Sequence, residues 1–135
     1  MGRFLFICFG GALGTGARYL VATWVAQAFG PEFPRGTVLI NVTGSFLIAV
    51  IMELSLTAGV ISPSVRMFLT TGMMGGYTTY SSFNYETVRL AEQGTWGLAT
   101  LNLGVTVLGC LVAGVLGLIT ARVLARAAFG MASRA

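Results

Sequence analysis

Long apolar stretches alternate with short polar breaks along this chain. Turn-forming residues interrupt the apolar pattern at residues 30–34, at Ser62-Pro63 and at Gln93-Gly94. A helix needs about 20 mostly apolar residues to span a bilayer, and each of the four stretches between these breaks is long enough. Because the connections are short, neighbouring spans should be antiparallel. We therefore expect four membrane-spanning helices, at about residues 4–29, 36–59, 66–90 and 96–125.

Composition supports lipid as the solvent of this chain. Apolar residues make up 56% of the sequence and charged residues only 9%, against about 25% charged residues in typical soluble domains. So few charges cannot cover the surface of a soluble fold. We therefore predict a single all-α, multi-pass membrane domain over residues 1–135. All the basic residues are arginines, and they are not clustered as in a nucleic-acid-binding patch, so we expect no nucleic-acid partner.

Polar residues inside the third span indicate where function resides, because polar groups are costly in hydrocarbon unless they pair or line a cavity. Gly75 and Gly76 are followed by threonines and serines, which are poor material for a continuous membrane helix. Non-helical backbone at membrane depth survives only when it is buried in protein or lines a water-filled path. Its freed carbonyls can bind a cation, and the next half-helix N-terminus favours an anion. We predict a functional break here; a simple kink is the alternative.

Two sets of side chains around this break suggest a path for an anion. Tyr80 and Phe83 are three residues apart and lie on one helix face. Their ring edges are positive, so rings presented edge-on would stabilise a small anion, whereas simple packing is the alternative role. In the fourth span Asn102, Thr106 and Cys110 recur every four residues. This stripe of weak hydrogen-bond donors could replace the hydration shell of an anion in steps.

The segment GGYTTYSSFNYET, residues 75–87, closely resembles the signature of the Fluc (CrcB) family of bacterial fluoride channels. The similarity extends to GGALG at residues 10–14 with Arg18, to Gly36-Thr37 leading into Asn41, and to the glycine-rich fourth span. It therefore covers nearly the whole chain. The resemblance implies a fluoride-selective channel for passive, electrogenic export of toxic fluoride across the bacterial inner (plasma) membrane.

The resemblance also implies an assembly. Members of this family are antiparallel, dual-topology homodimers with two pores, each built from residues of both subunits. The positive-inside rule modestly favours a cytoplasmic N-terminus for this chain, because more arginines lie on that side. Dual topology therefore requires that this arginine excess is too weak to enforce one orientation.

Individual residues receive roles from the same resemblance. Arg18 and Glu86 are expected in the vestibule, and the backbone carbonyls of Gly75 and Thr78 are expected to hold a structural sodium ion, Na+, at the dimer interface. Tyr80, Cys110 and Gly114 depart from the phenylalanine, serine and threonine common at these positions. The residues expected to form the fluoride pore are Tyr80, Phe83, Asn41, Ser81, Asn102, Thr106 and Cys110.

Three other classes of protein are alternatives to a channel. A proton-coupled small multidrug or anion transporter is also a four-span dimer, but it is expected to carry a glutamate in the first span, where this chain has only Arg18. A structural membrane subunit would use its polar stripes only to hold helices together. An enzyme is disfavoured, because the sequence has no histidine and no evident nucleophile–base pair.

Overall fold

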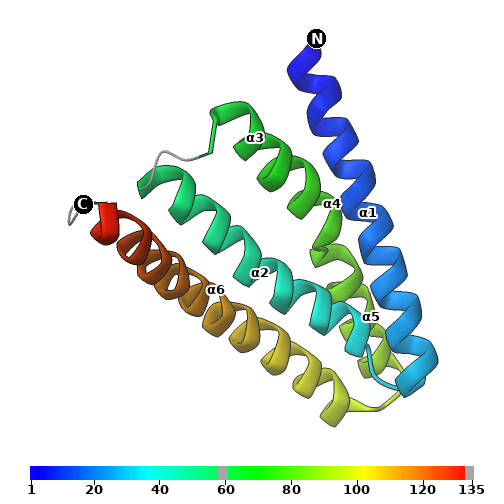
Figure 1. The fold of residues 1–135 in the computed structure, drawn as a ribbon. Coiled ribbons are helices and arrows are strands. Elements are labelled where there is room, and N and C mark those ends of the chain that lie inside the picture. The colour runs from blue at the N-terminus through cyan, green and yellow to red at the C-terminus, as the bar shows by residue number, and fades with distance from the viewer. Residues whose placement is uncertain (58–60, 133–135) are drawn as a thin grey trace.

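The computed structural model describes residues 1–57 and 61–132, and the regular elements in this part of the chain are all helical (Figure 1). Three of them are long helices: α1 (Gly2–Phe29), α2 (Arg35–Thr57) and α6 (Trp96–Ala132). The chain between α2 and α6 forms shorter elements: α3 (Pro63–Met67), the π-helix η1 (Phe68–Met74), α4 (Gly75–Tyr77) and α5 (Tyr80–Glu92). The predicted all-α class is confirmed for these residues.

Three of the four expected spans correspond to single helices. Within the described residues, α1, α2 and α6 are the helices long and apolar enough to cross a membrane. The expected end of the second span, at residue 59, lies outside the described residues. In the region of the fourth span, α6 continues to Ala132, beyond the end expected near residue 125. Large apolar side chains are exposed along these helices, including Phe9, Trp24 and Leu108, which suits a lipid environment or a partner chain rather than water.

Two extended residues divide the segment expected to form the third span. Thr78 has φ −80° and ψ 158°, and Thr79 has φ −154° and ψ 117°, so α4 ends at Tyr77 and α5 begins at Tyr80. The Thr79 hydroxyl caps α5 by accepting a hydrogen bond from the Ser82 backbone N–H at 3.2 Å, the usual function of threonine at a helix start.

The helices on either side of this extended pair pack against different neighbours. η1 and α4 lie along α1, whereas α5 packs against α6, and α2 lies along most of α6 (Figure 1). Glycines permit the closest approaches: a Cβ atom at Gly14 would collide with the Met73 carbonyl oxygen, and one at Gly117 would lie 2.5 Å from the Phe46 carbonyl oxygen. Close backbone contact of this kind supplies the van der Waals packing on which helix association in lipid depends.

Candidate functional site

A cavity of about 490 Å³ lies where the extended pair meets α2 and α6. Among the described residues that line it, none carries a charge. Its polar and aromatic lining comes from three places: α2, the start of α5 with the residues before it, and α6. These lining residues are Asn41, Ser45, Thr78, Thr79, Tyr80, Phe83, Thr106 and Cys110.

The backbone of Thr79 is held by the side chain of Asn41. The Asn41 amide nitrogen donates to the Thr79 carbonyl oxygen at 2.9 Å, and the Thr79 N–H donates to the Asn41 amide oxygen at 2.8 Å. In a continuous helix that N–H would instead donate to the carbonyl of Gly75, four residues earlier. Asn41 therefore satisfies both backbone groups of a residue that the helix has released. One of its two amide N–H groups remains for another acceptor.

A second polar contact ties α4 to α2. The Thr43 hydroxyl lies 2.7 Å from the Leu39 carbonyl oxygen and 3.0 Å from the Tyr77 hydroxyl. A hydroxyl has one proton, so when Thr43 donates to Leu39, Tyr77 is the donor to Thr43. The last residue of α4 is thereby anchored next to the extended pair.

The two aromatic residues differ in exposure. Their ring centroids are 5.8 Å apart at an interplanar angle of 60°, an edge-to-face arrangement. The Phe83 side chain is buried, with 5% of its surface exposed, whereas Tyr80 is 77% exposed although it also lines the cavity. The cavity is therefore open on the side where Tyr80 lies, and Phe83 forms part of its inner wall.

The expected stripe of donors on α6 is divided by the fold. Thr106 and Cys110 line the cavity, but Asn102 does not. Asn102 is 0% exposed, and its amide nitrogen donates to the Thr87 hydroxyl at 2.8 Å. Its amide oxygen lies 3.4 Å from the Thr106 hydroxyl, which donates to it. Ser81, also expected in the pore, is exposed outside this cavity, with its hydroxyl 3.3 Å from that of Thr79.

A second cavity, of about 450 Å³, contains one of the two residues expected in a vestibule. Glu86 lines it and accepts a hydrogen bond from the Thr37 hydroxyl at 2.8 Å. The other carboxylate oxygen of Glu86 is buried and has no hydrogen-bond partner in the described part of the chain. Arg35 and Arg89 line the same cavity, whereas Arg18 is half-buried on α1 and lines neither cavity.

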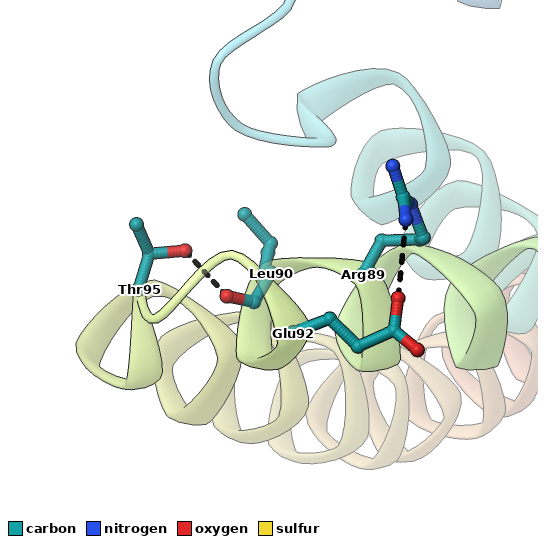
Figure 2. A network of polar contacts seen from close by, with 4 residues as sticks. All are labelled: Arg89, Leu90, Glu92 and Thr95. Carbon is teal, nitrogen blue, oxygen red and sulfur yellow. Dashed lines mark hydrogen bonds and ion pairs between the residues drawn. The ribbon is translucent and has the colours of Figure 1, made fainter.

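The far end of α5 is joined to α6 by a tight turn. The Thr95 hydroxyl donates to the Leu90 carbonyl oxygen at 2.7 Å, and Arg89 forms an ion pair with Glu92 at 3.1 Å (Figure 2). Gly94 adopts a positive φ of 76° in this turn, a conformation that glycine accepts without steric cost. Because the ion pair is exposed, it contributes little to stability.

Comparison with known proteins places the chain in a family. A family model described as CrcB-like protein, Camphor Resistance (CrcB), matches residues 5–118. The chain belongs to the CrcB family. The family resemblance predicted from residues 75–87 is thereby confirmed.

Relatives in this family are similar along most of their length. A protein of Anaeromyxobacter sp. (strain K) is 59% identical over 113 residues, which cover 84% of this chain and 90% of the relative. One from Sorangium cellulosum (strain So ce56) is 52% identical over 122 residues, or 90% of this chain and 96% of the relative. One from Citrifermentans bemidjiense is 42% identical over 124 residues, or 92% and 100%. All three are named fluoride-specific ion channel FluC.

The fold also brings into the site region residues to which sequence analysis assigned no role. Thr79 provides the backbone that Asn41 holds, and Thr87 accepts the Asn102 amide. Tyr77 anchors the end of α4 to α2. Each is a hydroxyl-bearing residue within residues 75–87, so the sequence contained a signal for polar contacts there. It did not contain the identity of their partners.

Proposed function

We propose that this chain is a fluoride-selective ion channel that mediates passive, electrogenic export of fluoride. Membership of the CrcB family and the names of its relatives support this function. None of the three relatives reported above is named as a drug transporter or an enzyme. The single observation that carries the proposal is the uncharged cavity. It is lined by Asn41, Tyr80, Phe83, Thr106 and Cys110.

The chemistry of that lining suits a small, strongly hydrated anion. Asn41 retains one amide N–H, and Cys110 adds a weaker thiol donor. The Thr106 hydroxyl has one proton, which it directs to Asn102 at 3.4 Å, so it can donate to the ion only by releasing that long contact. The edges of Tyr80 and Phe83 add partial positive charge. Together these groups compensate for lost hydration without a fixed positive charge that would trap the ion. The same donors would favour fluoride over chloride, because they can approach the smaller ion more closely.

The segment of residues 63–92 forms the third membrane crossing in this proposal. It has 15 helical residues before the extended pair and 13 after it. At about 1.5 Å per residue this is roughly 40 Å of helix, more than the roughly 30 Å of a hydrocarbon core. The whole chain is then a four-span domain of the bacterial inner membrane, with its third helix broken at Thr78 and Thr79.

Two copies in antiparallel orientation complete the proposed channel. The exposure of Tyr80 on an open cavity is what a pore wall shared with a second subunit requires. At the dimer centre the carbonyls of Gly75 and Thr78 would hold a structural sodium ion. The residues fit this role in one respect. In a continuous helix the Thr79 N–H would donate to the Gly75 carbonyl, whereas here it donates to Asn41. Oxygen ligands of this type suit hard cations.

Fluoride efflux from liposomes tests the proposed function. Purified protein is reconstituted in vesicles loaded with fluoride or chloride, and efflux is followed with ion-selective electrodes while an ionophore balances charge. We expect fluoride efflux that depends on the charge-balancing ionophore, with chloride efflux near the protein-free background. Vesicles that release no fluoride above background would exclude the proposal.

Phe83→Ile separates a channel from a structural subunit. The substitution keeps the side chain apolar but removes the ring edge from the cavity wall. We expect fluoride efflux per folded protein to fall by about tenfold or more, since a loss of only about 1.4 kcal/mol of stabilisation of the migrating ion lowers a rate tenfold. The mutant protein should still elute as the wild type does on size exclusion. Unchanged efflux would assign Phe83 to packing alone.

A further inference from the structure

Asn102 is placed where it holds another helix instead of facing the cavity. It is 0% exposed and is absent from the cavity lining, although Thr106, four residues later, lines that cavity. A buried amide must be hydrogen-bonded, because an unpaired one is costly. The partner that the fold provides for its N–H is the Thr87 hydroxyl on α5, at 2.8 Å.

Thr87 links Asn102 to Phe83, which lines the cavity. Its hydroxyl donates to the Phe83 carbonyl oxygen at 2.7 Å. The one proton of Thr87 is thus committed, so the hydroxyl accepts from Asn102 and the two hydrogen bonds run in one direction. On its other side the Asn102 oxygen accepts from Thr106 at 3.4 Å. The resulting chain joins Thr106, Asn102, Thr87 and the Phe83 carbonyl.

We propose that Asn102 is a positioning residue for conduction, which acts through Thr87 to hold α5 and the Phe83 ring at a fixed distance from the cavity face of α6. This inference rests on the proposed channel function. We call Asn102, Thr87 and the Phe83 carbonyl the α5 bracket. It departs from the role expected from the sequence, in which Asn102 contacts the ion directly.

The location of the bracket along α5 explains why it matters. The start of α5 is held by the contact of Asn41 with Thr79, and its end by the turn between Leu90 and Thr95 (Figure 2). Among the described residues, the contact of Asn102 with Thr87 is the side-chain hydrogen bond that joins the middle of α5 to α6. Phe83 lies one helical turn before Thr87. The neighbouring residue Glu86 is held to α2 by Thr37 at 2.8 Å, so loss of the bracket would leave α5 attached to α2 but would let the ring move relative to Thr106 and Cys110 on α6.

Substitutions at Thr87 test the bracket without altering the cavity lining. Thr87→Val keeps the side-chain shape but removes the hydroxyl, which leaves a buried Asn102 N–H without its acceptor. We expect fluoride efflux per folded protein to fall by about tenfold, in line with the loss of a buried hydrogen bond. Thr87→Ser retains the hydroxyl and should restore efflux to within about twofold of the wild type.

Asn102→Leu and the double variant with Thr87→Val complete a cycle. If Asn102 and Thr87 act through one bracket, fluoride efflux from the double variant should be no lower than efflux from the more impaired single variant. This follows because the effects of coupled residues are not additive. Thr120→Val is the matched control: Thr120 makes the same kind of hydrogen bond, to the Leu116 carbonyl at 2.8 Å, far from α5. Efflux in this control should equal that of the wild type.

The possible outcomes of this experiment lead to different conclusions. Efflux is normalised to folded, monodisperse protein in the vesicles, so a purely structural defect lowers the amount of protein but not the normalised efflux. Normal efflux in Thr87→Val, with or without a loss in Asn102→Leu, would overturn the bracket while leaving the channel intact. A wild-type chain that passes no fluoride would overturn the proposed function as well. If Asn102→Leu does not fold, the pair Thr87→Val and Thr87→Ser decides alone.

Discussion

The two halves of the segment at residues 63–92 are held in place by different kinds of contact. The first half, η1 and α4, lies against α1 through backbone contacts at glycines, as at Gly14 against Met73. The second half, α5, is attached through side-chain hydrogen bonds from Asn41, Thr37 and Asn102. Close backbone packing tolerates no added atom, whereas hydrogen-bonded side chains can be altered singly. We therefore expect mutations in the first half to affect folding and mutations around the second half to affect permeation.

Gly14→Ala should have the largest effect on stability. The added methyl would collide with the Met73 carbonyl oxygen and lie 2.9 Å from the Tyr77 backbone nitrogen. Since these are backbone atoms, α1 has to move away from η1, at a cost of about 3 kcal/mol. The effect is measured as loss of monodisperse protein and a lower melting temperature in detergent. Gly16→Ala is the matched control, because a Cβ at Gly16 would meet no atom within 4 Å. Equal behaviour of the two variants would contradict the close approach.

Asn41→Leu should have the next largest effect, on conduction more than on folding. It removes both hydrogen bonds to the backbone of Thr79, which are part-buried and contribute about 0.5–1.5 kcal/mol each, and it removes the remaining amide donor from the cavity. We expect fluoride efflux to fall at least about tenfold. Wild-type efflux from Asn41→Leu would break the proposed distinction between the halves.

Substitution of the exposed ion pair at the end of α5 should have the smallest effect. Arg89 and Glu92 have exposed side chains (51% and 59%), and such pairs contribute about 0–1 kcal/mol. Glu92→Gln should leave both melting temperature and efflux near those of the wild type. Thr95→Val removes the hydrogen bond to Leu90 (Figure 2) and should cost about 1 kcal/mol. A larger decrease in melting temperature for Glu92→Gln than for Thr95→Val would show that the ion pair stabilises this turn more than the hydrogen bond does.

The sequence predicted the helical spans more fully than the site. Apolar stretches located α1, α2 and α6, because span length and hydropathy are local properties. The pattern around Gly75 and Gly76 indicated a break, and the extended residues Thr78 and Thr79 lie just after it. The contacts that hold this region were not predictable. Asn41 and Thr79 are 38 positions apart, and Asn102 and Thr87 are 15 apart, so their pairing depends on how separate helices approach.

Sequence alone determined the solvent and the class of this protein: so few charges and such long apolar stretches leave a helical membrane protein, and residues 75–87 identify its family. Only the tertiary structure decided what each polar residue faces. Asn102, Thr106 and Cys110 share one helical stripe, yet α5 hydrogen-bonds Asn102 through Thr87 while Thr106 and Cys110 line the cavity. The periodicity of a helix places residues on a face, but the neighbouring helix determines which part of that face is covered.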